Sequence, residues 1–212
     1  MFTFVNFVNA QLSAITIFGN TMTKNETNKL LAIFMLATVV TISGANYGFA
    51  SHGEEKWASS DVDYKCMSNL YNLDMETGSS ECWDLLSSVD IWNGIASSSL
   101  DFDQVTSGQD IEVTSLNLYG AALAYSSPTI SGTTITESII VFDNSEEWGD
   151  KDGDDWWKWW VIDYISVGAH EFGHNVRLVH DSSSDLMEDF TDANVHRTPS
   201  SHDISEVQGM YP

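Results

Sequence analysis

The spacing of hydrophobic positions predicts a helix between residues 81 and 95. Apolar residues recur there every three or four positions, which places them on one face of a helix. This face is formed by Trp83, Leu86, Val89 and either Ile91 or Trp92. Gly94 lies close to the end of the pattern, where the helix is expected to stop.

Three short segments downstream have the alternation or the β-branched content of strands, namely 111–118, 121–125 and 134–142. Residues 161–177 predict a buried helix, and Ser200 or Ser201 is a suitable N-cap for a final short helix. A helix, then strands, then two helices is an order found in α+β proteins, so the sequence predicts an α+β fold.

The first fifty residues have the organisation of a secretory signal. A polar stretch at 24–29 is followed by an apolar run at 30–42 and by small residues up to Ala50. The apolar run is shorter than the roughly 20 residues that span a bilayer, so cleavage after Ala50 is expected, with a retained membrane anchor as the alternative. Because Met22 would be a conventional start for such a signal, residues 1–21 are interpreted as an over-extended start.

The leader sets the domain organisation and the compartment. The chain divides into a leader at 1–50, with the signal peptide at 22–50, an N-terminal segment of the mature chain at 51–80, and a main domain at 81–212. An exported chain is secreted or at the cell surface, with no stable membrane span expected after cleavage. In an oxidising compartment Cys66 and Cys82 would form a disulfide, whereas in a reducing one they would be two unrelated thiols.

The composition is strongly acidic, with 8 Lys plus Arg against 31 Asp plus Glu and a formal net charge of −23. Such a surface would repel the phosphates of nucleic acids and anionic lipid headgroups, which argues against both as partners. It would attract cations, including calcium, and basic peptide segments. The alternative is that the acidic residues only keep the protein soluble. The oligomeric state is left open.

One short motif carries metal chemistry: His170, Glu171 and His174 form an H-E-x-x-H pattern. Two histidines four positions apart lie on the same face of a helix and can bind one metal ion. Glu171 lies beside them, where it can accept a proton from a metal-activated water. His180 follows as a candidate third ligand, and three protein ligands with one open position are typical of a catalytic zinc site.

With Met187 following, the motif resembles the signature of the metzincin metalloproteases, H-E-x-x-H-x-x-G-x-x-H and a methionine turn. Within that group the chain is most similar to the matrixins. The supporting segments are GAALA at 120–124, which resembles their substrate-binding edge strand, Phe142-Asp143 with Glu146 and Trp148, which matches their F-D-x-x-E-x-W, and SHDISEVQGMY at 201–211, which resembles their closing helix.

The resemblance implies a fold and roles for individual residues. The fold would be a twisted mixed sheet of about five strands packed with three helices, with a turn ending the active-site helix and Met187 in a turn below the zinc. Asp143 and Glu146 would bind a structural calcium ion, with two solvated acids as the alternative. Leu123 and Ala124 would pair with the backbone of an extended substrate.

The chain departs from the matrixin pattern at Arg177, which stands where the family has a glycine after the second histidine. That glycine lets the chain turn sharply out of the helix, with a positive φ expected, and an arginine there would cost roughly 1–2 kcal/mol. Tyr125 and Val141 stand where two histidines of a second, structural zinc site would fall, so one zinc ion is expected.

Other residues could take over parts of this site. Asp181 or Asp185 could replace His180 as the third ligand. Cys66 could cap the zinc instead of pairing with Cys82, although the disulfide is favoured.

An acidic loop and four tryptophans precede the predicted metal-binding helix. The loop at 150–155 has the carboxylates and the glycine of a calcium loop, but it lacks the distal glutamate of an EF-hand, so an exposed acidic loop is favoured. For the tryptophans, packing against the sheet is favoured over a substrate- or surface-binding platform. They are Trp156, Trp157, Trp159 and Trp160.

These patterns predict a secreted zinc-dependent endopeptidase that hydrolyses polypeptides with a zinc-activated water and Glu171 as the general base. The alternative is a catalytically weak or inactive domain of the same kind, which binds zinc and a peptide or a surface because Arg177 distorts the turn before His180. A third interpretation is a calcium-dependent adhesive module that uses the acidic loop and the tryptophans.

Overall fold

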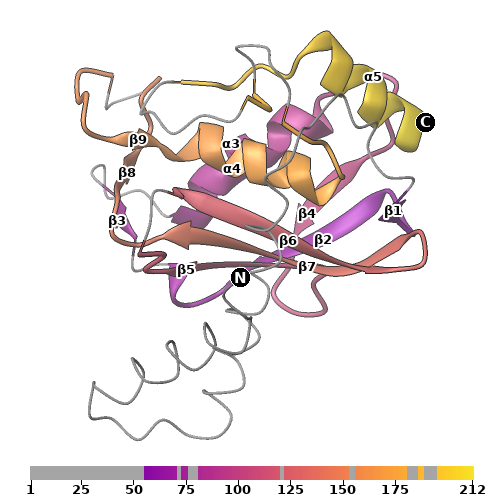
Figure 1. Cartoon of the computed structure of the whole chain (residues 1–212), viewed down its shortest axis with the longest axis horizontal. Helices are drawn as coiled ribbons and strands as arrows, with labels where there is room; N and C mark the ends of the chain where they lie inside the picture. Colours follow the sequence, from indigo (N-terminus) through magenta and orange to yellow (C-terminus); the bar gives the residue numbers. More distant parts are fainter. Residues whose placement is uncertain are drawn as a thin grey trace, which may run out of the picture. The chain divides into compact units, whose positions relative to one another are not determined.

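The computed structural model of the chain describes residues 55–70, 73–75, 81–119, 122–152, 156–180, 186–188 and 195–212 (Figure 1). The leader, with the predicted signal peptide and its cleavage site, lies outside these residues. Within the described part of the chain, no helix is both long enough and apolar enough to cross a bilayer.

A mixed β-sheet is the framework of the protein. Five strands run side by side in the order β6-β7-β5-β2-β4, and the short strand β1 pairs with the start of β7. β6 runs antiparallel to β7, and every other pair in this sheet is parallel. The strands are β1 (Lys56–Trp57), β2 (Asp61–Cys66), β4 (Asp101–Gln104), β5 (Ile111–Leu116), β6 (Ala124–Ser131) and β7 (Thr134–Asp143).

Three further short strands form a separate small sheet, which leads directly into the second helix. They are β3 (Asp74–Met75), β8 (Glu147–Gly149) and β9 (Ile162–Asp163), in the order β3-β8-β9. The pairs of this sheet are parallel.

The described residues form three helices: α3 (Glu81–Asn93), α4 (Tyr164–Asn175) and α5 (Ser201–Met210). Figure 1 shows α3 and α4 side by side on one face of the sheet. A mixed sheet with three helices confirms the predicted α+β fold. Ser200 is the N-cap of α5 and forms a capping box with Asp203, which agrees with the start predicted for the final helix.

The two central helices are packed at contact distance. Trp92 Nε1 donates to the carbonyl oxygen of Ala169 at 2.8 Å, and Ser88 Oγ donates to that of Ile165 at 3.1 Å. A Cβ at Gly168 would lie 2.6 Å from Ser88 Oγ, so this close approach of the helices requires a glycine.

The buried face of α4 packs against the sheet through aromatic rings. The Phe172 ring lies 5.4 Å from that of Tyr64 on β2 and 4.9 Å from that of Phe102 on β4. All three side chains are buried. Because Phe172 lies between the two histidines of the motif, this contact sets the rotation of α4 about its axis and directs the histidines away from the sheet.

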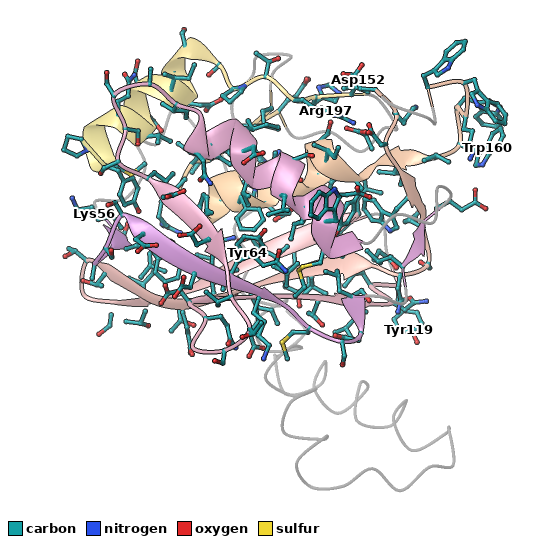
Figure 2. All side chains as sticks on the ribbon, turned by 180° about the vertical axis from the view of Figure 1, so that it is seen from behind. Lys56, Tyr64, Tyr119, Asp152, Trp160 and Arg197 are labelled. Atoms are coloured by element: carbon teal, nitrogen blue, oxygen red, sulfur yellow. A yellow bond between two sulfur atoms is a disulfide. The ribbon has the colours of Figure 1, made fainter. Side chains whose placement is uncertain are left out.

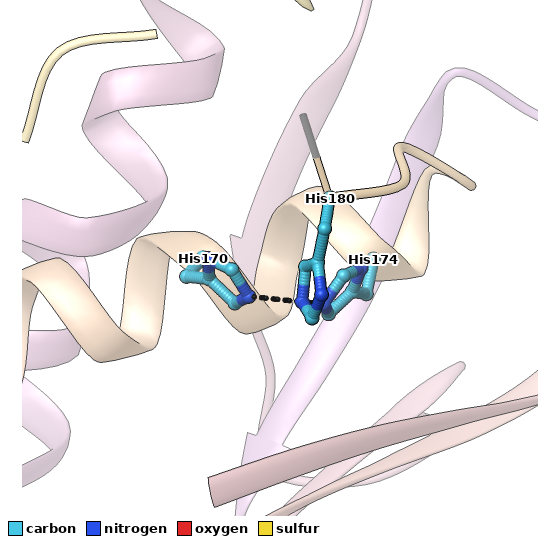
Figure 3. Close-up of side chains that lie close together, drawn as sticks. All are labelled: His170, His174 and His180. Atoms are coloured by element: carbon cyan, nitrogen blue, oxygen red, sulfur yellow. Dashed lines mark hydrogen bonds between the residues drawn. The ribbon is translucent and has the colours of Figure 1, made fainter. Parts of the chain in front are cut away.

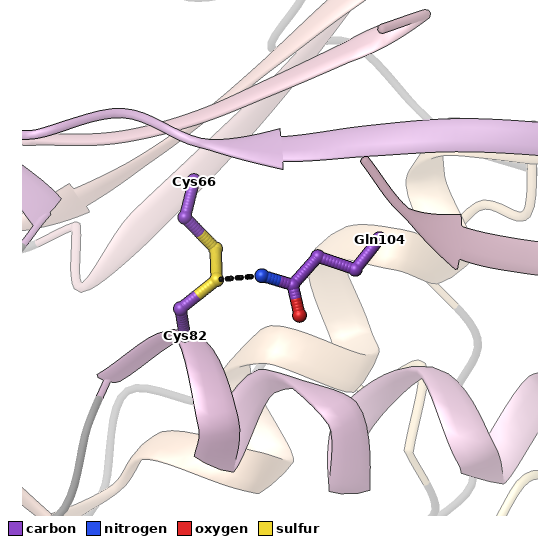
Figure 4. Close-up of a disulfide and its surroundings, with 3 residues drawn as sticks. All are labelled: Cys66, Cys82 and Gln104. Atoms are coloured by element: carbon purple, nitrogen blue, oxygen red, sulfur yellow. Dashed lines mark hydrogen bonds between the residues drawn. A yellow bond between two sulfur atoms is a disulfide. The ribbon is translucent and has the colours of Figure 1, made fainter. Parts of the chain in front are cut away.

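A disulfide joins Cys66 at the end of β2 to Cys82 at the start of α3, with the Cα atoms 6.0 Å apart (Figure 4). The cysteines are separated by 16 positions. Closing a loop of this length restricts the unfolded chain and stabilises the fold by about 3 kcal/mol. Gln104 Nε2 donates to Cys82 Sγ at 3.0 Å, so β4 also contacts the bridge.

The structure differs from the predicted buried face of the first helix. Trp83 is 71% exposed, whereas Leu85 is fully buried together with Val89 and Trp92. At the start of the helix the buried face is shifted by one residue from the predicted one, because the disulfide holds Cys82 inward. The four tryptophans at 156–160 were also expected to pack against the sheet, and this prediction is wrong because all four are exposed.

Several strands were not predicted. β2 and β4 alternate between aspartates and apolar residues, and they pair in register from Asp61 with Asp101 onward. Acidic residues are unusual in strands, which obscured an otherwise regular alternation. β1 and β2 belong to the segment 51–80 that was separated from the main domain, and β2 lies in the interior of the sheet between β4 and β5.

Candidate metal centre

Helix α4 carries the H-E-x-x-H motif and is fixed at its N-terminus by Asp163. The Asp163 carboxylate accepts the backbone N–H of Ser166 at 3.0 Å, as expected of an N-cap, and also accepts the Ser166 hydroxyl. The helix was predicted to start at residue 161, three residues before the observed Tyr164. Nearly every residue of the helix is buried, so its axial position is closely determined.

Three imidazoles converge at the C-terminal half of α4 (Figure 3). His180 Nε2 lies 3.0 Å from Nε2 of His170 and 3.0 Å from Nε2 of His174. Within the described residues this is the one group of three or more candidate metal ligands whose ligand atoms lie within 4.8 Å of one another. His170 is buried, His174 is partly buried and His180 is exposed, so the cluster opens to solvent on one side.

A tight turn after α4 brings His180 back to the helix. Leu178 N donates to the carbonyl of Gly173 at 3.1 Å, and Arg177 N donates to that of His174 at 3.0 Å. Arg177 has a φ of 66°. The expected positive φ at this position is therefore confirmed, and the arginine adopts the conformation that the family assigns to glycine.

Hydrogen bonds to backbone carbonyls determine which ring nitrogen of each helix histidine is free to bind a metal. His170 Nδ1 lies 2.7 Å from the carbonyl oxygen of Leu186, and His174 Nδ1 lies 2.9 Å from that of Leu178. A carbonyl only accepts, so both Nδ1 atoms carry the proton. Each neutral ring then has its Nε2 lone pair directed at the centre of the cluster.

Burial keeps these rings neutral. It lowers the pKa of His170 to about 4 and the pKa of His174 to about 3, because a charged ring would lose its hydration inside the protein. Neutral imidazole is the form that binds a metal ion, so near pH 7 the cluster needs no deprotonation to act as a ligand set.

The residues present fit a zinc ion. Zinc sites with three protein ligands are tetrahedral, and Zn–N distances of about 2.1 Å place ligand nitrogens roughly 3.4 Å apart. The observed 3.0 Å separations are close to that value. Without a cation, two unprotonated nitrogens would face His180, whose single Nε2 hydrogen can satisfy only one of them. A cation at the centre satisfies all three.

Glu171 is oriented by the same helix and has an unsatisfied oxygen. The side chain is 5% exposed, and among the described residues its Oε2 atom has no hydrogen-bond partner. Burial raises the pKa of this carboxyl to about 8. A buried carboxyl oxygen without a hydrogen bond is costly in a purely structural role, so the observation favours a functional role for Glu171.

Met187 is fully buried and packs against α4. A Cβ at Gly173 would overlap Met187 Sδ and would lie 2.9 Å from Trp92 Cζ2. Gly173 therefore makes room for this contact. Leu186, immediately before Met187, provides the carbonyl that holds His170. The neighbouring candidates Asp181 and Asp185 lie outside the described residues.

The two candidate calcium ligands are Asp143, the last residue of β7, and Glu146 in the turn that follows. Asp143 is buried, and its Oδ1 accepts both the backbone N–H of Ser145 at 2.9 Å and the Ser145 hydroxyl at 2.7 Å. Its carbonyl accepts Trp148 Nε1 at 2.8 Å. These hydrogen bonds form a turn that needs Asp143 and Trp148 at their spacing in the F-D-x-x-E-x-W pattern. Glu146 lies within this turn and is partly buried. Calcium binding at this turn stays a prediction.

The two candidate substrate contacts lie at the start of β6, beside α4. Leu123 accepts Asp143 N at 2.8 Å, and Ala124 pairs with Phe142. In the described residues β6 pairs with β7 alone, so its other edge is open to a further strand. Asn175 Nδ2 at the end of α4 donates to Ser126 Oγ at 2.8 Å and ties this strand to the metal helix.

Sequence reasoning missed a polar network behind the site. Arg197 donates through Nε and Nη2 to both oxygens of Asp163, at 2.9 and 2.5 Å, and contacts Asp150 at 2.6 Å. The neighbouring His196 N donates to Ser166 Oγ at 2.8 Å. The N-terminus of α4 is thereby fastened to the segment before α5. Asp163 and Arg197 are 34 positions apart, so their pairing depends on the tertiary fold and no local pattern predicted it.

A mixed sheet with a helix that carries two histidines and a glutamate, joined by a third histidine beyond a tight turn, defines a zinc metallopeptidase domain. Residues 56–212 match the family model described as Matrixin. A search of curated proteins found no match. The chain therefore belongs to the matrixin family of metallopeptidases.

Proposed function

We propose that this protein is a secreted endopeptidase that hydrolyses peptide bonds with one zinc ion held by His170, His174 and His180. The observation that carries the proposal is the convergence of three Nε2 atoms, two of them unprotonated, on one point that is open to solvent. Export is supported by the signal-like leader in the sequence and by the disulfide between Cys66 and Cys82.

When bound, zinc supplies a Lewis acid that polarises the substrate carbonyl and acidifies a water molecule. Glu171 would serve as the general base that accepts a proton from the attacking water, and it would then return that proton to the leaving amine. Burial raises the pKa of Glu171, which makes its carboxylate a stronger base than an exposed one. Hydrogen bonds to the carbonyls of Leu186 and Leu178 keep the imidazole rings of His170 and His174 in the orientation that binds the metal.

The open edge of β6 is the proposed substrate site. An extended polypeptide would add to the sheet there through main-chain hydrogen bonds, with Leu123 and Ala124 as the nearest partners. Asn175 fixes β6 against α4, so the substrate backbone would run alongside the metal helix. Main-chain pairing is independent of side-chain identity, which suits polypeptides as a general substrate class.

The test is cleavage of a denatured protein mixture by the purified zinc-loaded protein, with and without o-phenanthroline. Chelator-sensitive cleavage with one zinc per chain is expected. Glu171→Gln preserves shape and burial but removes the base, so cleavage should fall at least 1000-fold while zinc stoichiometry stays at one. His202→Gln, which changes an exposed histidine on α5, is the control and should cleave as the wild type does.

The left-handed conformation of Arg177 supports one competing function, a domain that binds zinc and peptide without turnover. Zinc bound at one per chain with no cleavage of any substrate would favour this alternative.

We also propose that Asp143 and Glu146 bind a structural calcium ion. This proposal predicts that added calcium raises the unfolding temperature and that Glu146→Gln removes this effect.

A further inference from the structure

Four tryptophans of one loop stand exposed between β8 and β9. The exposed fractions of Trp156, Trp157, Trp159 and Trp160 are 73%, 58%, 80% and 41%. Residues 156–160 are called the tryptophan loop below. Figure 2 shows Trp160 at an outer end of the molecule, far from Tyr64 in the core. Tryptophan is among the most apolar side chains, so a cluster left in water indicates a surface that another phase or molecule covers.

The ring geometry argues against a flat stacking platform. The Trp160 ring lies 5.9 Å from that of Trp157 at 84° and 5.9 Å from that of Trp159 at 88°. Sugars and bases stack on ring faces, and a chain of them needs faces that lie in one direction. Rings at right angles direct their edges and N–H groups to different sides. Such a cluster can insert into a lipid interface, because lipid headgroups are mobile and adapt to the shape of the inserted side chains.

The size of the loop argues against a protein partner. A stable protein interface takes about 800 Å² and roughly 20–30 residues from each side. The tryptophan loop supplies five consecutive residues. Bilayer interfaces, in contrast, are entered by a few tryptophans whose rings lie in the headgroup region while their N–H groups stay hydrated.

The charges select the kind of lipid. The whole chain has a net charge of −23, so an anionic membrane would repel it. The loop itself carries a cation, Lys158, whose Nζ lies 5.4 Å from the centre of the Trp157 ring. A zwitterionic surface offers phosphates to that lysine and quaternary ammonium groups to the faces of the indole rings.

We propose that the tryptophan loop inserts into the headgroup region of membranes whose surface lipids are zwitterionic, such as phosphatidylcholine, and holds the protein there. Membrane attachment through this loop is independent of the metal centre. It would confine the proposed protease to substrates at a lipid surface.

The experiment measures binding of the full chain to phosphatidylcholine vesicles by sedimentation, and quenching of tryptophan fluorescence by brominated phosphatidylcholine. Trp156→Ser/Trp159→Ser changes the two most exposed rings of the loop. Trp83→Ser on α3 is the matched control, because Trp83 is 71% exposed and lies outside the loop. Circular dichroism checks that each variant is folded. The apolar run at 30–42 is present in every variant, so the comparison isolates the loop.

The loop variant should bind at least 10-fold more weakly than the wild type and should lose most of the quenching, whereas Trp83→Ser should bind within 2-fold of it. Anionic lipid mixed into the vesicles should weaken wild-type binding, and added salt should restore it. Three results would overturn the proposal: equal binding of the loop variant and the wild type, binding to insoluble neutral polysaccharide but not to vesicles, or self-association of the wild type that the loop variant abolishes.

Discussion

Arg177 is the residue at which the chain departs most clearly from its family. Its φ of 66° lies in the left-handed region, which costs a side chain with a Cβ about 1–2 kcal/mol. The compensating ion pair with Glu55 is long, at 3.7 Å, and both side chains are partly exposed, so it contributes little. The turn is therefore formed in spite of the arginine.

Arg177→Gly should raise the free energy of unfolding by about 1 kcal/mol, because glycine adopts this φ without strain. Urea denaturation of the zinc-loaded protein measures the change. Arg177→Ala is the control, since it removes the same guanidinium but keeps a Cβ in the left-handed conformation, and no gain is expected from it. A stabilised alanine variant would show that the guanidinium, and not the backbone, carries the cost.

Glu171 predicts a pH dependence for the metal-free protein. Burial raises its pKa from 4.5 to about 8, so between these values the folded state holds a proton that the unfolded state releases. The carboxyl's contribution to stability is thus fully present below pH 4.5 and is lost as the pH rises towards 8. Glu171→Gln removes this dependence.

In urea titrations with a chelator, the stability of Glu171→Gln relative to the wild type should therefore be greater at pH 8 than at pH 5. The depressed pKa values of His170 and His174 act on both proteins alike and cancel in the comparison. If the difference in unfolding free energy between Glu171→Gln and the wild type were the same at pH 5 and pH 8, the folded protein would not hold Glu171 as a buried, protonated carboxyl.

The residues of the metal centre were predictable because the H-E-x-x-H spacing is a local property. Positions i and i+4 share a helix face wherever the helix lies. The sequence showed only that the chain could turn back far enough for His180 to reach the helix histidines. The 3.0 Å distance between Nε2 of His180 and Nε2 of His170 depends on the turn at Arg177 and on the carbonyl of Leu178. The role of Leu186 as the partner of His170 had no signal in the sequence.

Helix α4 is held at its start and in its middle. Asp163 caps its start and pairs with Arg197, while Trp92 and Phe172 fix its middle against α3 and the sheet. Thr198, next to Arg197, accepts Leu186 N at 3.0 Å, and the carbonyl of Leu186 holds His170. The network at the helix start is thus connected to the metal centre through backbone hydrogen bonds.

Arg197→Gln should lower the free energy of unfolding by roughly 3 kcal/mol, because it leaves Asp163, which is 1% exposed, without its cationic partner. Arg197→Lys keeps the charge but cannot bind both carboxylate oxygens, so an intermediate loss is expected. Chemical denaturation measures both. If the two variants were equally stable, the bidentate geometry would have no part in holding the helix.

Element boundaries show where local patterns were sufficient. The start of α5 was predicted to within one residue, with Ser200 or Ser201 as the N-cap, and the capping box between Ser200 and Asp203 shows that it is Ser200. The face of α3 was misjudged at Trp83 because helical spacing alone allows neighbouring phases, and the disulfide at Cys82 selects between them. Strands β2 and β4 were missed because their aspartates alternate with the core residues.

The acidic composition acts on the whole molecule. With 31 acidic and 8 basic side chains, the folded state concentrates like charges that the unfolded chain spreads apart. Raising NaCl from 0.05 to about 1 M should therefore increase the unfolding temperature of the zinc-loaded protein, since the Debye length falls from more than 10 Å to about 3 Å. An equal osmolality of sucrose separates screening from solute exclusion. If the unfolding temperature did not change with salt, or fell, repulsion between the acidic side chains would not contribute significantly to the stability of the protein.

The sequence by itself determined the features that depend on neighbours along the chain: the α+β order and the helix that bears His170, Glu171 and His174. The left-handed turn at Arg177 was expected only from the glycine that matrixins have at this position. Only the tertiary structure decided which distant groups meet. The pairing of Arg197 with Asp163, the carbonyl that orients His170 and the exposure of the tryptophan loop all follow from packing. Local spacing constrains a few backbone angles, whereas contacts between distant residues depend on every angle between them and on the burial that the complete fold provides.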